Sequence, residues 1–318
     1  MMNPKDPSGI KIVFMGTPEF SAVSLKALAD AGYNVVLTVT QPDKPVGRKH
    51  IITPSPVKVL SQELGIPVYQ PSTFKEEGSE DEIRNCNPDL IVTAAYGKIL
   101  PQRVLDIPAF GALNVHGSLL PLKRGAAPVQ RAVLEGDEVT GVTIMKMDAG
   151  MDTGDILSMA EYKIPENMHS SELMSELANV GADLLIRTVP DYLSGAIKSI
   201  AQDNDKATYS PPIEATEGLI DWNDAAITVH NRIRALSEWP GAFTYMNGKK
   251  LKIYDSVRED IDVSGKPSGA VIKPDKKTLV VVCGSGAVRI LKLQQEGGKV
   301  LPASDIAHNI SEGTMLGV

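Results

Sequence analysis

The sequence is poor in cysteine, in aromatic residues and in long apolar runs. Its 318 residues include only Cys86 and Cys283, too few and too far apart for a disulfide framework or a zinc cluster, so we expect two incidental reduced thiols. No apolar run approaches the roughly 20 residues that cross a bilayer, so the sequence alone argues against a membrane protein. The start of the chain, Met1 to Pro7, lacks the apolar core of a signal peptide and the Arg-rich pattern of an organellar one.

An excess of positive charge is also missing. The chain has 32 Lys and Arg against 39 Asp and Glu, a net charge of −7. Residues 208–318 carry thirteen of each sign, so the whole negative excess lies before them. Any nucleic-acid binding must therefore use local basic patches and not a bulk positive field.

The first part of the chain alternates apolar runs with helical patterns, which is typical of a mostly parallel α/β sheet. The predicted strands are 10–16, 33–41, 90–96, 112–116, 141–147 and 156–164. The predicted helices are 18–31, 57–64, 126–135 and 170–193. A long connection rich in Pro, Gly and charge runs from Pro42 to Pro56.

The pattern changes after the long predicted helix. Residues 195–216 lose periodicity and contain Asp203-Asn204-Asp205 and Pro211-Pro212, so we place a linker there and divide the chain into residues 1–206 and 207–318. A helix at 225–236 then precedes short β-like runs at 250–257, 269–273, 278–283 and 286–294. This part predicts a small β-barrel or sandwich.

Chemistry is expected where strands of the sheet end, because ligands of open α/β sheets bind beyond the carboxyl ends of the strands. Asn114 and His116 end a predicted strand and, as residues i and i+2, point to the same face. An amide donor beside an imidazole can hold a carbonyl oxygen that becomes an oxyanion. From these residues alone, a turn-forming Asn and a surface His remain the alternative.

Two loops complete the candidate site. Residues 117–128 form a connection punctuated by Gly and Pro, which indicates either a shaped pocket or a plain strand-to-helix loop. Residues 148–155 hold two glycines and the carboxylates of Asp148, Asp152 and Asp155. A metal site is disfavoured because no further ligands recur at a regular spacing. We expect one carboxylate to orient the imidazole or move a proton while the others cap turns.

These segments resemble the signature of the 10-formyltetrahydrofolate-dependent formyltransferase family. The matching motifs are Asn114-Val115-His116-Gly117-Ser118-Leu119-Leu120-Pro121, Arg124-Gly125-Ala126-Ala127-Pro128 and Asp152-Thr153-Gly154-Asp155. Further similarity, to the branch that formylates methionyl-tRNA, lies in Met15-Gly16-Thr17-Pro18-Glu19-Phe20, Gln41 to Arg48, Pro54 to Lys58, Asp221-Trp222, Ile233 to Leu236 and Trp239 to Ala242. The resemblance covers nearly the whole chain.

The resemblance implies a Rossmann-like, mostly parallel α/β sheet with helices on both faces, followed by a small OB-like β-barrel that binds tRNA. It implies that Asn114, His116 and Asp152 are catalytic, with no metal. It also implies that the loop of Ser118, Leu119, Leu120 and Pro121 lines the pocket for 10-formyltetrahydrofolate. Lys123 stands where the family often has an aromatic residue, and we assign it no role.

The acceptor implied by this branch is the α-amino group of methionine on initiator tRNA, in the cytoplasm, with the enzyme a monomer. The segment from Pro42 to Ile52 is similar to the family's tRNA-sensing loop, with Lys44, Arg48 and Lys49 suited to phosphate contacts. Its prolines and glycine predict disorder until tRNA binds. Further basic candidates for tRNA contacts are Lys206, Arg232, Arg234, Lys249, Lys250 and Lys252.

Two other functions remain open. A nucleotide-sugar formyltransferase or a formyl-folate hydrolase would share the Asn, His and Asp set, and only the 42–48 loop and the residue 222–240 region favour tRNA. A non-catalytic dinucleotide- or RNA-binding module is disfavoured, because Gly16-Thr17-Pro18 lacks the GxGxxG pattern that binds dinucleotide phosphates.

Overall fold

The computed structural model describes residues 6–47 and 50–317, and these divide into two compact units. The first unit consists of the described residues up to Pro128, together with Thr140–Lys163 and Met174–Ser210. The second consists of Val129–Val139, Ile164–Leu173 and the chain from Pro211 onward. Two short segments from the first part of the sequence thus belong to the second unit. None of the described helices is long and apolar enough to cross a membrane.

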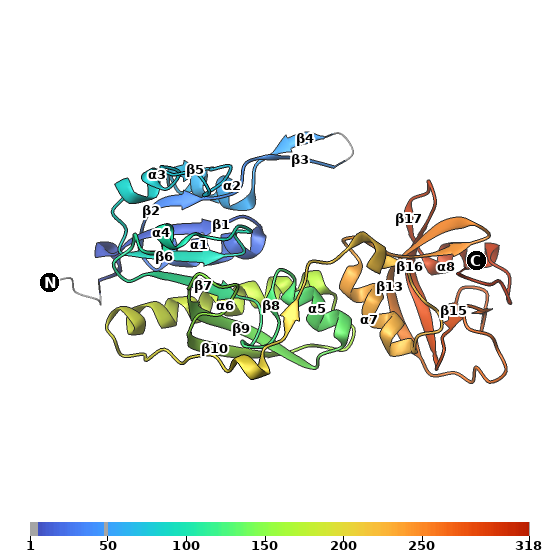
Figure 1. The fold of residues 1–318 in the computed structure, drawn as a ribbon. Helices are drawn as coiled ribbons and strands as arrows, with labels where there is room; N and C mark the ends of the chain where they lie inside the picture. Colours follow the sequence, from blue (N-terminus) through green and yellow to red (C-terminus); the bar gives the residue numbers. More distant parts are fainter. Residues whose placement is uncertain (1–5, 48–49, 318) are drawn as a thin grey trace. The chain divides into compact units, whose positions relative to one another are not determined.

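The first unit is built on a seven-stranded sheet (Figure 1). In spatial order its strands are β10 (Ile156–Lys163), β9 (Val139–Lys146), β7 (Ala112–His116), β6 (Leu90–Ala94), β1 (Lys11–Gly16), β2 (Asn34–Val39) and β5 (Val68–Tyr69). The pairs β1–β2, β1–β6, β2–β5 and β6–β7 are parallel, whereas β7–β9 is antiparallel. The predicted mostly parallel sheet is confirmed.

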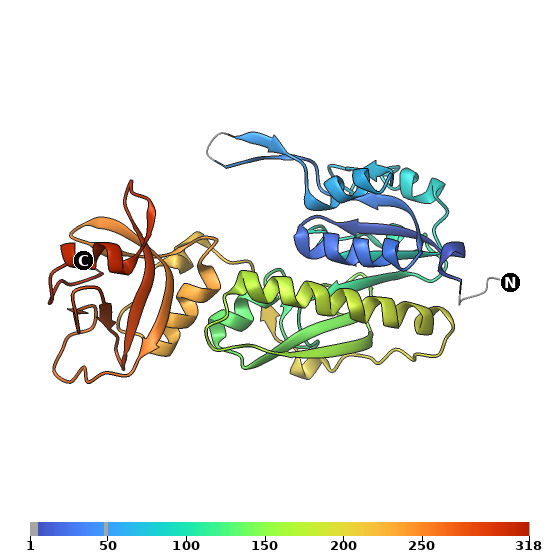
Figure 2. The same cartoon turned by 180° about the vertical axis from the view of Figure 1, so that it is seen from behind.

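Helices cover both faces of this sheet, which is why strands such as β6 are buried along their whole length. The helices that contribute to the unit are α1 (Glu19–Asp30), α2 (Pro56–Glu63), α3 (Asp81–Asn85), α4 (Gln102–Leu105) and α6 (Ser170–Leu193). Figure 2 shows α1 and α6 on one face. On the other face Ile83 of α3 and Val104 of α4 share a core with Val13 and Met15, alternate residues of β1.

Regular secondary structure occupies part of the segment from Pro42 to Ile52, for which the sequence predicts disorder until tRNA binds. β3 (Lys44–Val46) and β4 (Ile51–Thr53) form an antiparallel hairpin that extends from the first unit (Figure 1). The β-branched run Ile51-Ile52-Thr53 favours a strand, and Gly47, with φ of +70°, begins the turn as glycine readily does. Arg48 and Lys49 lie outside the described residues.

Much of the aperiodic segment 195–216 is built into the first unit. Ile200 bridges Ile156, and β11 (Tyr209–Ser210) pairs in parallel with β8 (Arg124–Gly125). Between them lies the short 3-10 helix Asn204–Lys206. Because the segment is held by backbone hydrogen bonds to loops and does not pack a repeating apolar face, it carries no hydrophobic period.

The second unit contains a six-stranded sheet that curls into a small half-barrel, which confirms the predicted β-rich C-terminal part (Figure 1). Its strands are β12 (Ala242–Met246), β13 (Lys249–Glu259), β16 (Ala287–Gln295), β15 (Leu279–Val282) and β14 (Val271–Ile272), with β17 (Val300–Pro302) also paired to β16. All the pairs are antiparallel. Val229 and Ile233 of α7 (Ala226–Leu236) pack into its core. The remaining helices are α5 (Pro128–Glu135) and α8 (Ala303–Ile306).

Candidate active site

Asn114 and His116 lie at the carboxyl end of β7, an interior strand between β6 and β9. Thr93 of β6 is the register partner of Asn114, and its hydroxyl donates to Asn114 Oδ1 at 2.8 Å. Because the amide oxygen is held by Thr93, the Nδ2 group, a donor only, points the other way. Thr93 was not predicted from the sequence, although it lies in a predicted strand.

His116 is 5% exposed, and each of its ring nitrogens faces an oxygen atom. Nε2 lies 3.1 Å from the Lys123 carbonyl oxygen, and since a carbonyl only accepts, Nε2 carries a hydrogen. Nδ1 lies 3.7 Å from Asp152 Oδ1, in reach of its charge but beyond a direct hydrogen bond. The carboxylate of Asp152 therefore faces the imidazole on its Nδ1 side.

Asp152 sits in a turn that places its carboxylate toward His116. Its φ is +55°, a left-handed conformation that costs a non-glycine residue about 1–2 kcal/mol. Its Oδ2 accepts from the Gly125 N–H at 2.9 Å. Gly125 has φ of +118°, and a Cβ there would lie 2.8 Å from the Ser210 oxygen, so only glycine fits.

The other two carboxylates of this turn accept hydrogen bonds from other groups. Asp148 Oδ1 accepts from the Gly150 N–H at 3.0 Å and from the Thr153 hydroxyl at 2.7 Å. Asp155 Oδ2 accepts from the Ser199 hydroxyl at 2.7 Å. Asp152 is thus the carboxylate of this turn that faces the imidazole.

Hydrogen bonds to its own backbone fix the shape of the loop after β7. The Ser118 hydroxyl donates to the Leu122 oxygen at 2.6 Å, and the Thr143 hydroxyl joins the Ser118 oxygen to the Leu120 N–H at 2.7 and 3.1 Å. Ser118 and Leu120 are buried, with Leu120 in an apolar cluster, whereas Leu119 and Pro121 are half-buried. Of the four predicted folate-binding residues, Leu119 and Pro121 thus offer the more accessible side chains.

The basic residues predicted to contact tRNA differ in how they are engaged. Lys44 is exposed, and its Nζ donates to Gln41 Oε1 at 2.9 Å. Lys250 lies 3.5 Å above the Phe243 ring, and Lys206 pairs with Asp203 at 3.0 Å. Arg234 is 4% exposed and donates to Asn231, and Arg232 pairs with Asp224. We therefore read these two arginines as packing residues.

Sequence reasoning gave no role to Arg124, and it missed Gln202 altogether. Arg124 begins the motif Arg124-Gly125-Ala126-Ala127-Pro128. Its side chain is 2% exposed and is among the largest fully buried side chains. Its guanidinium donates to Gln202 Oε1 and Asn204 Oδ1. Gln202 lies in the aperiodic segment, where no periodicity or motif could have marked it.

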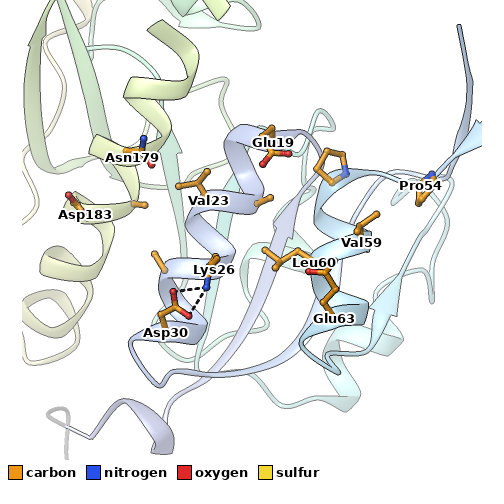
Figure 3. A pocket seen from close by; sticks show the side chains of 14 residues that line it. Glu19, Val23, Lys26, Asp30, Pro54, Val59, Leu60, Glu63, Asn179 and Asp183 are labelled. Carbon is orange, nitrogen blue, oxygen red and sulfur yellow. Dashed lines mark hydrogen bonds and ion pairs between the residues drawn. The ribbon is translucent and has the colours of Figure 1, made fainter. Parts of the chain in front are cut away.

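A pocket of about 680 Å³ lies elsewhere in the first unit, between α1, α2 and α6 (Figure 3). None of the described residues that line it is a predicted site residue. Glu19, Glu63 and Asp183 line it, and its Lys26 is paired with Asp30. This negative lining is unsuited to an anionic folate or a phosphate. Among residues 6–47 and 50–317, no group of three or more His, Cys, Asp or Glu is placed to hold a metal ion.

Comparison with known proteins places both units in one family. Residues 10–189 match the family described as formyl transferase, and residues 212–310 match the formyl transferase C-terminal domain. The chain therefore belongs to the formyl transferase family. A methionyl-tRNA formyltransferase of Acetivibrio thermocellus is 44% identical over 97% of this chain and all of that protein. One of Macrococcus caseolyticus is 46% identical over 92% of this chain and 94% of the relative.

Solved structures show the same fold at low identity. An N-formyltransferase of Helicobacter canadensis, solved with folinic acid and dTDP-3-aminofucose, has a TM-score of 0.68 at 18% identity, over 88% of this chain and 98% of that one. Methionyl-tRNA formyltransferase from Clostridium thermocellum has a TM-score of 0.53 at 16% identity, over 80% and 95%.

Proposed function

We infer that this protein is an enzyme that transfers the formyl group of 10-formyltetrahydrofolate to the α-amino group of methionine on initiator tRNA, for translation initiation. The observation that carries this conclusion is the placing of Asn114 and His116 at one strand end, with Asp152 Oδ1 3.7 Å from the imidazole. It occurs in a chain that methionyl-tRNA formyltransferases match over nearly its whole length.

In the proposed mechanism the neutral amine attacks the formyl carbon and forms a tetrahedral intermediate with an oxyanion. Asn114 Nδ2 and the His116 imidazole donate to that oxyanion, and the hydrogen bond from Thr93 to Asn114 Oδ1 leaves Nδ2 available for this role. Asp152 accepts the amine proton and helps return it to N10 as the bond between the formyl carbon and N10 breaks. No covalent enzyme intermediate is needed.

The binding roles are proposals of the same kind. We propose that the loop from Ser118 to Pro121, which follows His116 directly, lines the folate site. We propose that Lys44, Arg48 and Lys49 contact the tRNA backbone and that residues 207–318 form the tRNA-binding domain, with residues 1–206 as the catalytic domain. The β3–β4 hairpin supports the proposed tRNA contacts, because its residue Lys44 is exposed. Because the acceptor is a tRNA, we propose a cytoplasmic enzyme, and on the family resemblance alone we propose that it acts as a monomer.

A formyl-transfer assay tests the acceptor. The protein and radiolabelled 10-formyltetrahydrofolate are offered methionyl initiator tRNA, methionyl elongator tRNA, a nucleotide-linked amino sugar, or water alone. Transfer to the initiator tRNA that is lost in Asp152→Asn supports the proposal. Transfer to the sugar, or folate turnover in water alone, would assign the protein to another branch of the family.

A further inference from the structure

The carboxylate of Asp152 depends on a turn whose backbone accepts two hydrogen bonds from the side chain of Gln202. Gln202 Nε2 donates to the Asp152 carbonyl oxygen at 2.9 Å and to the Gly154 carbonyl oxygen at 2.6 Å. The two bonds span the turn on either side of Thr153. Because Asp152 has a left-handed backbone, the turn needs such outside contacts to keep one conformation.

Gln202 is itself fixed by a buried arginine. Arg124 Nε and Nη2 both donate to Gln202 Oε1, at 3.0 and 2.7 Å. A guanidinium has no acceptor, so the amide oxygen must face it and both amide hydrogens must face the turn. The two hydrogen bonds from the guanidinium therefore fix which way the amide of Gln202 faces.

The partners of Arg124 are unusual for a buried charge. Within the described part of the chain, its side chain donates to the neutral oxygens of Gln202 and, at 2.8 Å, Asn204. Burial of a guanidinium whose partners are neutral is costly, because no ion pair offsets the lost hydration. The next residue, Gly125, supplies the N–H that holds Asp152 Oδ2. Arg124 and Gly125 thus act on Asp152 from two directions, one through Gln202 and one directly.

We propose that Gln202 is a positioning residue for the formyl-transfer reaction, and that Arg124 orients it. Gln202 holds the backbone of Asp152 while Gly125 holds its carboxylate, and together they set the distance from Asp152 Oδ1 to His116 Nδ1. The role rests on the proposed function. It gives the segment before Pro211 a part in catalysis that is separate from joining two domains.

The test distinguishes the amide oxygen of Gln202, which accepts from Arg124, from its NH2 group, which donates to the turn. Gln202→Glu keeps an oxygen for Arg124 but replaces both donors with a carboxylate that repels the Asp152 and Gly154 carbonyl oxygens. We expect kcat to fall about 10- to 100-fold, because small misplacements of a catalytic group have effects of this size. We expect the KM values for folate and tRNA to change less than about threefold, since the positioned group acts on the reacting atoms.

Asn204→Ala is the matched control, because it removes another acceptor of Arg124 and leaves the turn untouched. Its kcat should stay within about twofold of the parent value. Gln202→Met, of similar length and without either polar face, should lose kcat as Gln202→Glu does, and melting temperatures show whether each variant is folded.

The outcomes distinguish this inference from the proposed function. An unsubstituted protein that transfers no formyl group to tRNA overturns the proposed function. Suppose that the unsubstituted protein is active. The positioning role is then wrong if a folded Gln202→Glu variant keeps the parent kcat, or if only its KM for folate changes. A loss in Asn204→Ala as large as in Gln202→Glu would also overturn it, because the effect would then come from the burial of Arg124.

Discussion

The two units each bury a histidine, and the comparison shows what makes one of them a candidate for catalysis. His116 is 5% exposed and His230 is 1% exposed, so burial does not distinguish them. His230 Nδ1 lies 3.1 Å from the Ser256 hydroxyl and Nε2 lies 3.3 Å from the Glu166 carbonyl oxygen. His116 instead faces a carboxylate at Nδ1, with an amide two residues away on the same strand face.

The surroundings of His230 show that its polar contacts join segments of the second unit. Glu166 belongs to the segment Ile164–Leu173, His230 to α7 and Ser256 to β13. Close by, Arg234 donates to the Met168 oxygen and Ser170 to the Ala235 oxygen. The polar contacts around His230 thus fasten chain segments together, whereas Asn114 and His116 meet at the end of one strand.

The largest effects should come from the first of these two sites. Asn114→Ala and His116→Ala should each lower kcat by about 10²- to 10³-fold, the usual cost of losing one oxyanion donor. The melting temperature should change little in Asn114→Ala, whose side chain is half-buried. Steady-state formyl transfer to initiator tRNA measures the effect. Activity within tenfold of the parent in both variants would refute the assigned site.

For His230→Ala we expect the opposite result, a loss of stability without a loss of kcat. The substitution leaves a cavity and removes the partner of the buried Ser256 hydroxyl, which should cost about 2–4 kcal/mol of stability. The kcat of the remaining folded protein should be unchanged. Denaturant unfolding gives the stability, and activity at low denaturant gives the kcat. A stable but inactive His230→Ala would show that the two histidines are not as different as we describe.

The pH dependence of stability sharpens the comparison. Burial lowers the pKa of His230 below its ordinary value of 6.5, so the unfolded chain binds the proton more readily than the folded one. Stability is therefore full above about pH 6.5 and is lost as the pH falls toward the folded pKa. Melting temperatures between pH 7.5 and 5.5 should fall in the parent protein and fall less in His230→Gln. Parallel curves would contradict this.

The smallest effect concerns an ion pair of the second unit. Two hydrogen bonds, at 2.6 and 2.9 Å, join Arg131 to Glu217, and they lower the pKa of Glu217. This stability is present above the unfolded pKa near 4.5 and is lost as the pH falls below it. Glu217→Gln should cost about 1 kcal/mol at neutral pH and less at pH 4. Equal losses at both pH values in unfolding experiments would exclude the ion pair as the cause.

Local sequence patterns predicted most of the elements. The helix at 170–193 and the strand at 112–116 have the predicted bounds, because each presents an uninterrupted periodic or apolar run. The β3–β4 hairpin was missed because prolines and charges dominate the segment around it. The pairing of β8 with β11 has no local signal, since two-residue strands bury too little to leave a pattern.

The sequence by itself determined that Asn114 and His116 share a strand face, because residues two apart on a strand always do. Only the tertiary structure decided which of three carboxylates faces the imidazole, and it did so through the left-handed backbone of Asp152 and the Gly125 N–H. It also brought Gln202 to that turn and assigned Val129–Val139 and Ile164–Leu173 to the second unit. Such contacts join residues far apart in the chain. Their geometry depends on how loops close and on which buried polar groups find partners. The spacing of apolar residues along a short segment carries no information about either.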